Sequence, residues 1–189
     1  MRTKIALFCS GSGSNAQKIM DYFKDSNTVE VAILMANKAG AFALERAKKM
    51  NIPTNIFDRK DFYESNDVLN ELKDRGVEWV ILAGFLWLIP ESLIETYPNK
   101  IINIHPALLP KYGGKGMYGF NVHKAVVTNK EKESGITIHY VNKNYDEGEF
   151  IFQASCSLDP LDSPEEVAKK VLQLEHEHFP KVIDKLING

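Results

Sequence analysis

Two polar side chains, Asn103 and His105, interrupt the apolar run INIHP in the middle of the chain. Residues 101–104 have the composition of a buried strand, and strand side chains alternate between faces, so these two point the same way. Pro106 favours extended backbone at His105, which preserves the alternation. An amide can donate a hydrogen bond to a developing oxyanion, and an imidazole can transfer a proton near neutral pH. The pair predicts either catalysis at the end of a strand or two structurally satisfied core residues.

A carboxylate that could orient the imidazole lies at Asp146, in the loop NKNYDEGEF. An aspartate beside a glycine is also typical of a solvated turn, so Asp146 alone is weak support for catalysis. His139, in the alternating run TIHYV, shares a face with Thr137 and could equally form a structural hydrogen bond. The five histidines and two cysteines lack the spacing of metal ligands, and we expect no bound metal.

A glycine-rich segment, SGSGSNA, follows the first apolar strand directly. Glycines permit a tight turn close to a ligand, and the next helix offers free N–H groups and the positive end of its dipole. A dinucleotide site would need an acidic residue about 20 positions further on, where this chain has Asn37 and Lys38. We expect a single phosphate here; a capped turn without a ligand and a dinucleotide site are the alternatives. The predicted phosphate site comprises Gly11, Ser12, Gly13, Ser14 and Asn15.

Strand-like and helix-like segments alternate in the first part of the chain. This order and the near-continuous apolar runs predict a Rossmann-like α/β fold, with a mostly parallel sheet covered by helices on both faces. Ligands of such sheets bind beyond the carboxyl ends of the strands. Apolar runs predict strands at 4–9, 29–36, 54–58, 78–85 and 101–104, and helical spacing predicts helices at 16–25, 41–50, 61–76 and 90–97.

The pattern changes after residue 130. Two β-rich stretches, 135–141 and 148–158, predict an antiparallel hairpin. Ser163 and Glu166 have the spacing of a capping box, which predicts the start of a closing helix. Pro180 is expected to kink or break that helix.

The composition, 44% hydrophobic and 25% charged over 189 residues, is ordinary for a single globular domain. A net charge of −2 gives no broad attraction to nucleic acid or to an anionic membrane. No apolar run is long enough to span a bilayer or to form a signal peptide. Cys9 and Cys156 lie in apolar runs and are expected to be buried, reduced thiols, which favours a cytoplasmic protein.

Four stretches of the chain, in this order, closely resemble the phosphoribosylglycinamide formyltransferase family. They are GSGSN (11–15), LAGFLWLIP (82–90), NIHPALLPKYGGKG (103–116) and YDEGEFIFQ (145–153). The resemblance covers nearly the whole chain, and the N-x-H-P-x-L-L-P block is highly specific to folate-dependent formyl transfer. It implies the formyltransferase fold and transfer of a formyl group from 10-formyltetrahydrofolate to the amine of glycinamide ribonucleotide, in purine biosynthesis.

The resemblance also implies roles for single residues. Asn103, His105 and Asp146 match the catalytic trio, Glu175 matches a carboxylate that binds the ribonucleotide, and Lys111 falls in the segment lining the substrate side. The folate pocket is implied for Phe85, Leu86, Trp87, Leu88, Ile89, Val141, Asn142 and Tyr145.

A single domain, 1–189, is expected from the same resemblance. Within it, residues 1–100 would form the nucleotide-phosphate-binding half and residues 101–189 the folate-binding and catalytic half. The partners implied are the two small-molecule substrates, without nucleic acid or membrane, and a monomer or weak homodimer is expected.

Two segments depart from the family pattern. Many members have GFMRIL where this chain has an apolar run containing Trp87, which either lines the folate pocket or only packs on the following helix. The stretch 113–126 is longer than the corresponding loop in some relatives, and we expect a loop that acts as a flap.

Related functions stay open as alternatives. A formyltetrahydrofolate deformylase shares the core but normally has an N-terminal regulatory domain, whereas the first predicted strand here begins at residue 4. Methionyl-tRNA formyltransferase carries an RNA-binding domain for which we expect no room in 189 residues. A nucleotide-sugar formyltransferase would keep the trio but has little use for the phosphate loop. A non-catalytic binder of phosphorylated ligands would not need the trio.

Overall fold

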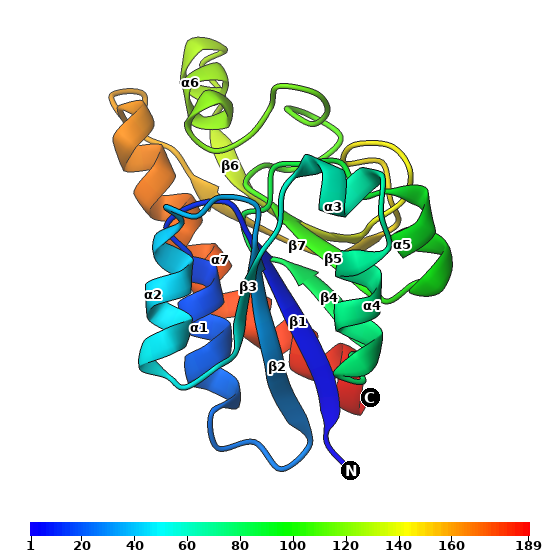
Figure 1. The fold of residues 1–189 in the computed structure, drawn as a ribbon. Helices are drawn as coiled ribbons and strands as arrows, with labels where there is room; N and C mark the ends of the chain where they lie inside the picture. The colour runs from blue at the N-terminus through cyan, green and yellow to red at the C-terminus, as the bar shows by residue number, and fades with distance from the viewer.

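One seven-stranded sheet forms the centre of the computed structural model, which describes all 189 residues. Its strands are Thr3–Cys9 (β1), Val29–Ala36 (β2), Thr54–Ile56 (β3), Trp79–Leu82 (β4), Ile101–His105 (β5), Glu133–Tyr140 (β6) and Phe150–Ser157 (β7). Their order across the sheet is β3-β2-β1-β4-β5-β6-β7 (Figure 1). The first five pair in parallel, and β6 and β7 add in antiparallel fashion. This confirms the predicted α/β sheet and its antiparallel hairpin.

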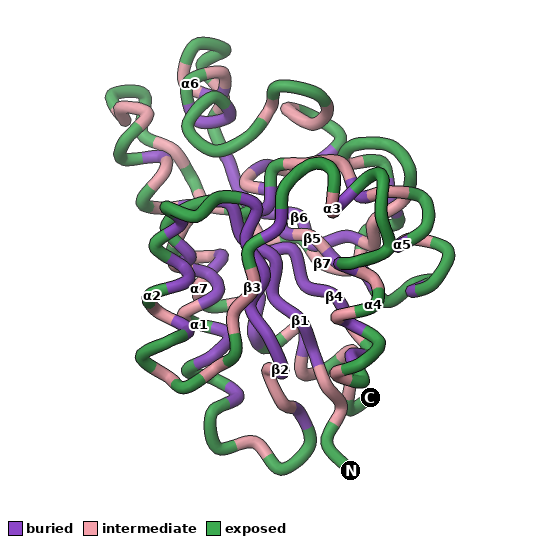
Figure 2. The backbone as a smooth tube through the Cα atoms, viewed as in Figure 1, coloured by how far each residue is buried: buried purple, intermediate pink, exposed green.

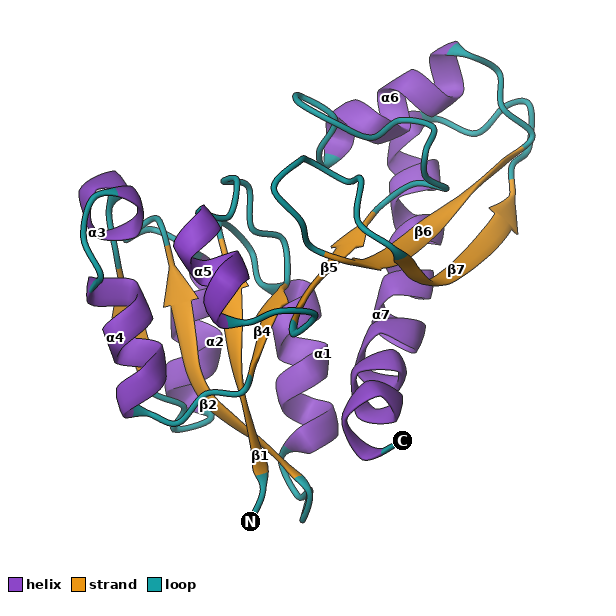
Figure 3. Ribbon diagram, turned by 90° about the vertical axis from the view of Figure 1, so that its right-hand side faces the viewer, coloured by secondary structure: helices purple, strands orange, loops and turns teal.

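Helices cover both faces of the sheet (Figure 3). They are Ser14–Phe23 (α1), Phe42–Lys49 (α2), Arg59–Tyr63 (α3), Asp67–Asp74 (α4), Glu91–Thr96 (α5), Phe120–Thr128 (α6) and Pro164–Asn188 (α7). Side chains of β1 point alternately to the two faces of the sheet and so belong to two separate cores. Leu7 packs with residues of α1, α2 and α7, whereas Phe8 packs with residues of α3, α4 and α5.

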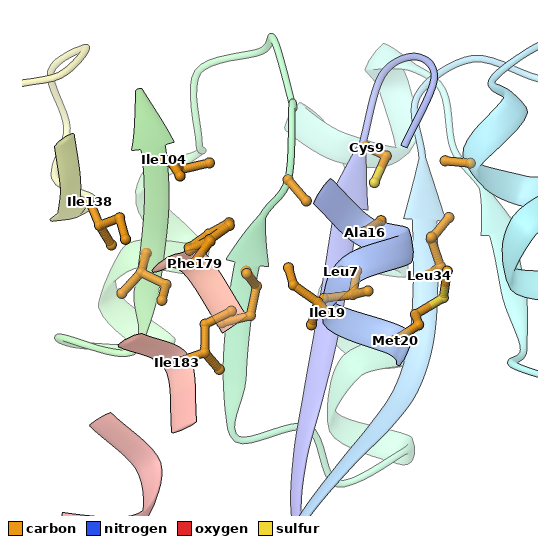
Figure 4. Close-up of a cluster of buried hydrophobic side chains, with 14 of the residues drawn as sticks. Leu7, Cys9, Ala16, Ile19, Met20, Leu34, Ile104, Ile138, Phe179 and Ile183 are labelled. Atoms are coloured by element: carbon orange, nitrogen blue, oxygen red, sulfur yellow. The ribbon is translucent and has the colours of Figure 1, made fainter. Parts of the chain in front are cut away.

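The larger core joins strands β1, β2, β5 and β6 to α1 and α7. Figure 4 shows Ile19 of α1 against Leu7 of β1, and Phe179 and Ile183 of α7 on the side of β5 and β6. Ile19 and Phe179 have no exposed surface, and full burial of such a side chain stabilises a fold by about 1.5–3 kcal/mol. The central strands are buried along most of their length, while exposed residues gather on the outer loops and helix faces (Figure 2).

The strand order reverses at β1: β2 and β3 are added on one side of it, and β4 and β5 are added on the other side. This arrangement opens a crevice at the carboxyl ends of these strands. Ser10 ties the two ends together: its backbone N–H donates to the Gly84 carbonyl at 3.0 Å, and its hydroxyl accepts from the Leu86 N–H at 3.0 Å. The crevice is therefore framed by fixed backbone.

The helix predicted over 61–76 is two helices, α3 and α4. Asp58 begins α3 through a capping box with Asp61. Ser65 then accepts from the Asp67 N–H at 3.2 Å and donates to the Asp61 carbonyl at 3.1 Å. Short polar side chains compete in this way with helical backbone bonds, which explains the break. Gly76, at φ +69°, follows the end of α4 and is the last residue of the predicted helical range.

The segment 113–126 is not a loop throughout, because α6 begins within it at Phe120. Val122 and Val126 are one turn apart and buried, so the core fixes this helix. Of the kink or break expected at Pro180, the break does not occur, because α7 continues to Asn188 with Pro180 inside it. Ser163 and Glu166 form the predicted capping box at its start.

Both cysteines are free thiols, but only Cys9 is buried. Cys156 is half-buried because β7 forms an edge of the sheet. None of the helices is both long enough and apolar enough to cross a membrane.

Candidate active site

A cavity of about 550 Å³ lies beyond the carboxyl ends of β1, β4 and β5. The glycine loop forms one end of its lining, and the segment after β4 forms an apolar wall. The end of β5, the loop before β7 and one face of α7 complete it. All the predicted site residues lie in this lining except two. The exceptions are Lys111, predicted on the substrate side, and Asn142, predicted in the folate pocket.

Asn103 and His139 face each other across the β5–β6 pair. The Asn103 Nδ2 lies 3.1 Å from the His139 Nε2, and the His139 Nδ1 lies 2.8 Å from the Tyr140 carbonyl. Because a carbonyl only accepts, Nδ1 of the neutral ring carries the hydrogen, and Nε2 accepts from Asn103. The ring thereby fixes the Asn103 amide, whose second N–H lies free at the cavity.

His105 ends β5 and is only 4% exposed. Its Nε2 lies 2.8 Å from the Tyr112 carbonyl, and its Nδ1 lies 3.5 Å from the Asp146 Oδ2. Burial lowers the pKa of His105; the charge of Asp146 and the Tyr112 carbonyl act against this, and His139 adds to it. The buried ring is therefore neutral at neutral pH and can accept a proton.

Asp146 occupies a tight turn at φ +57°, a conformation that aspartate tolerates better than most residues. Its Oδ2 accepts from the Gly114 N–H at 2.9 Å, and its Oδ1 lies 3.6 Å from the His139 Nε2. Burial alone would raise the pKa of Asp146, but the neighbouring His139 and His105 imidazoles and the Gly114 N–H together lower it. The carboxylate is therefore ionised beside two imidazoles.

Thr137 fixes the chain that leaves β5. Its buried hydroxyl donates to the Ala107 carbonyl at 2.7 Å and accepts from the Leu109 N–H at 3.0 Å. Thr137 and His139 share one face of β6, so one strand orients both the catalytic strand end and the segment that follows it.

The glycine loop is shaped by close contact with α2. Gly13 has φ +69°, and a Cβ at this position would lie 2.5 Å from the Ala43 Cβ, so only glycine fits. The Ser12 carbonyl accepts from the Arg46 Nε at 2.9 Å. No side chain caps α1 and no acidic residue lies in its first turn, so its N–H groups remain available to an anion.

Asn15 and Glu175 join α1 to α7 inside the cavity. The Asn15 Nδ2 donates to the Glu175 Oε2 at 2.7 Å, and both side chains are buried. Burial raises the pKa of Glu175, and the bond from Asn15 acts against this. The Asn15 Oδ1 is buried without a partner, which leaves an acceptor for a polar ligand.

Aromatic side chains support the apolar wall. Phe85 contacts Phe8 edge to face at 5.4 Å between ring centroids. Trp87 packs on Phe62 at 5.9 Å, lines the cavity and is covered by the Arg59 guanidinium at 4.8 Å. Trp87 therefore lines the cavity and packs on aromatic side chains of α3, rather than only on the helix that follows it.

Lys111 and Asn142 lie outside this lining. The Lys111 Nζ binds the Glu131 carboxylate at 3.1 Å and lines a second cavity of about 260 Å³. The Asn142 Oδ1 accepts from the Asn144 N–H at 2.9 Å, which shapes the loop that carries Asp146. His123 of α6 also lines the main cavity, and the sequence predicts no role for it, because its helix falls in a stretch whose glycines are typical of a loop.

Comparison with known proteins agrees with this geometry. Residues 3–183 match the family described as Formyl transferase. The chain therefore belongs to the formyl transferase family. The phosphoribosylglycinamide formyltransferase of Arabidopsis thaliana, named as chloroplastic, is 41% identical over 188 residues, which are 96% of this chain and 64% of that protein. The chain thus spans less than two thirds of this relative's length.

The fold is also similar to solved structures of enzymes with the same name. A phosphoribosylglycinamide formyltransferase from Anaplasma phagocytophilum superposes with a TM-score of 0.90 at 31% identity, covering 100% of this chain and 88% of the other. A glycinamide ribonucleotide transformylase 1 from Geobacillus kaustophilus gives a TM-score of 0.89 at 36% identity, covering 99% and 100%. These likenesses confirm the resemblance found in the sequence.

Proposed function

We propose that the protein transfers the formyl group of 10-formyltetrahydrofolate to the amine of glycinamide ribonucleotide, in purine biosynthesis. The observation that carries this proposal is the convergence of Asn103, His105 and Asp146 in one cavity, between a glycine loop and an apolar wall. The printed names of the similar proteins support the choice of acceptor.

The glycine loop would hold the phosphate of the ribonucleotide. Free N–H groups at the start of α1 favour an anion there. Asn15, the last residue of this loop, is hydrogen-bonded to Glu175, which would bind the ribonucleotide. The Asn15 Oδ1 has no protein partner and would accept a hydrogen bond from the same ligand.

The catalytic groups would act on the formyl carbon. The amine nitrogen forms a bond to this carbon, the bond from the carbon to the folate nitrogen breaks, the amine loses a proton and the folate nitrogen gains one. Asn103 donates to the oxyanion that forms on the formyl oxygen, which is worth about 3–4 kcal/mol of barrier. His105 helps to move the proton, and Asp146 stabilises the positive charge that His105 then carries.

The apolar wall would hold the folate ring system. Phe85, Trp87 and Ile89 line the cavity with apolar surface, and Val141 and Tyr145 line it as well. A flat heteroaromatic ring would fit this apolar part of the lining, beside the polar groups of the trio.

Narrower predictions also stay proposals. Residues 1–100 supply the phosphate loop and residues 101–189 the trio, although both halves line the cavity. Free cysteines support a reducing compartment such as the cytoplasm, while the plant relative is named as chloroplastic. Two further predictions rest on the sequence alone: that the protein binds no metal, and that it is a monomer or a weak homodimer.

The test is an assay that follows folate release by absorbance. The protein receives 10-formyltetrahydrofolate with and without glycinamide ribonucleotide. Release that depends on the ribonucleotide is the expected result. Release in its absence would identify a deformylase, in which water accepts the formyl group, and no release in either mixture would contradict the proposal.

A further inference from the structure

The Tyr112 carbonyl determines where the proton lies on the His105 ring. The two groups are 2.8 Å apart at Nε2, and His105 is buried. A carbonyl oxygen can only accept a hydrogen bond, so Nε2 must carry a hydrogen. In the neutral ring, the other nitrogen, Nδ1, is then unprotonated.

The two ring nitrogens face different parts of the molecule. Tyr112 lines the second cavity, whereas Asp146 lines the main cavity and its Oδ2 lies 3.5 Å from Nδ1. A proton that arrives at Nδ1 would thus be stabilised by Asp146 on one side of the ring and by Tyr112 on the other. His139 acts against the charged form of His105, and His105 in turn helps to lower the pKa of His123, after the larger effect of burial.

We propose that Tyr112 is a positioning residue, whose main-chain carbonyl holds neutral His105 in the Nε2–H tautomer and so makes Nδ1 the nitrogen that takes up the amine proton. The N–H bond of the attacking amine breaks, its electron pair stays on nitrogen, and the proton then passes to the folate nitrogen. The inference rests on the proposed role of His105.

A network of side chains holds the Tyr112 carbonyl in place. Tyr112 has φ +57°, which is strained for a residue with a Cβ. Its hydroxyl donates to the Glu131 Oε1 at 2.9 Å and accepts from the Asn129 Nδ2 at 2.9 Å. Bonding to Tyr112 lowers the pKa of Glu131, and burial raises the pKa of Tyr112, so both stay in the forms that this bond requires.

The same turn also holds Asp146. Two residues after Tyr112, the Gly114 N–H donates to the Asp146 Oδ2 at 2.9 Å. A Cβ at Gly113 would lie 2.6 Å from the Leu109 Cδ2, so the turn packs closely against the preceding segment. Residues 112–114 therefore place the Tyr112 carbonyl beside Nε2 and, through the Gly114 N–H, hold the Asp146 carboxylate beside Nδ1.

The tautomer can be read directly by nitrogen NMR of protein labelled with ¹⁵N in its histidines. The spectrum of His105→Gln identifies the His105 signals by their loss. We expect the Nε2–H tautomer of His105 in the wild-type protein at neutral pH. A Nδ1–H tautomer, or a ring protonated on both nitrogens, would overturn the inference. The reading needs no activity, so it stands apart from the test of formyl transfer.

The positioning role is tested with Tyr112→Phe, which keeps the ring but removes both bonds of the hydroxyl. We expect a mixture of His105 tautomers, a fall in kcat of about tenfold with little change in KM, and a shifted pH profile. The matched control is Tyr22→Phe, which removes a tyrosine–carboxylate bond to Asp184 away from the cavity. A pure Nε2–H tautomer and an unchanged pH profile in Tyr112→Phe would refute the role of Tyr112.

Discussion

Asn103 and His105 share a face of β5, yet their partners prepare them for different tasks. His139 binds one N–H of Asn103 and leaves the other at the cavity, which suits a donor to an oxyanion. His105 has a hydrogen-bond acceptor beside each ring nitrogen, which suits proton transfer. The sequence leaves open whether these residues are a satisfied pair or a reactive one, and the structure shows that their structural bonds are what orient them toward the cavity.

Replacing Asn103 with alanine removes the proposed oxyanion donor. We expect kcat to fall by about 10²–10³, with a small change in KM, because the interaction strengthens only in the transition state. Steady-state kinetics of Asn103→Ala measure this. Asn70→Ala, an exposed site on α4, serves as the control. A kcat within threefold of wild type would remove Asn103 from the chemistry.

Asp146→Asn removes a charge while keeping the turn, because asparagine also tolerates a positive φ and can accept from Gly114. We expect normal folding and a loss of at least about a hundredfold in kcat. The negative charge raises the pKa of His105, so its removal should move the acidic limb of the pH profile to lower pH. An unmoved limb would mean that the two groups are not coupled.

Some side chains at the site could not be assigned from the sequence. Lys111 is close in sequence to the trio, but Glu131, which lies beyond α6, binds it away from the main cavity. The sequence predicts that Asn103 and His105 lie on one face at the end of a strand, because strand side chains alternate between the two faces. His139 shows the same alternation, yet only its pairing with Asn103 across β5 and β6 gives it a role.

At the scale of elements, the junction of β1 and α1 depends on one glycine. Gly13 begins the helix in a left-handed conformation while Ala43 of α2 packs against it. The contact also fixes the loop, since Gly11 and Ser12 are bonded to α2 through Ala43 and Arg46. Packing of two helices therefore prepares the anion site before any ligand binds.

Gly13→Ala should lower the free energy of unfolding by about 2 kcal/mol or more, because it adds both backbone strain and a clash. Urea denaturation measures the loss. Gly40→Ala is the matched control, since a Cβ there meets nothing within 4 Å and no positive φ is required. Equal stability of the two variants would show that the loop relaxes freely.

Helix boundaries were harder to predict than the strands. The apolar strands of the buried sheet have continuous signals, and all five parallel strands were found. The break between α3 and α4 depends on hydrogen bonds of Ser65 that compete with the helix. Helix α6 follows a glycine-rich stretch and has only two buried valines, Val122 and Val126. These valines belong to the same core as the buried residues of α7, a contact that the sequence of α6 alone does not indicate.

At the scale of the whole molecule, the cavity results from the order of the strands. The reversal at β1 and β4 opens the crevice, and the antiparallel addition of β6 brings Thr137 and His139 to the end of β5. Parallel order could be inferred from alternating strands and helices. The resemblance placed Asp146 in the site, whereas residue pattern alone could not bring a loop that follows β6 to the end of β5.

Acid should destabilise the protein from about pH 6.5 downward. Burial lowers the pKa of His105, His123 and His176, so the unfolded chain binds protons that the folded chain does not. The lowered pKa of Asp146 adds a further loss at lower pH, whereas the raised pKa of Glu175 acts in the opposite direction. Urea denaturation across a pH series measures the sum.

One variant tests the contribution of a single histidine to this pH dependence of the unfolding free energy. His123→Phe removes a buried ring whose Nδ1 has no partner, so no hydrogen bond of that atom is lost. We expect a smaller fall in unfolding free energy between neutral and mildly acidic pH than in the wild type. A wild-type protein that gained stability on acidification would contradict the account of these histidines.

The most direct measurement follows the formyl carbon itself. The donor is 10-formyltetrahydrofolate labelled with ¹³C in its formyl group, mixed with glycinamide ribonucleotide and the protein, and the products are resolved by NMR. We expect the label to appear in the formamide of the ribonucleotide, at a rate that is much lower in Asn103→Ala and Asp146→Asn than in the wild type. Label that appears only as formate, or at equal rates in all three proteins, would contradict this expectation.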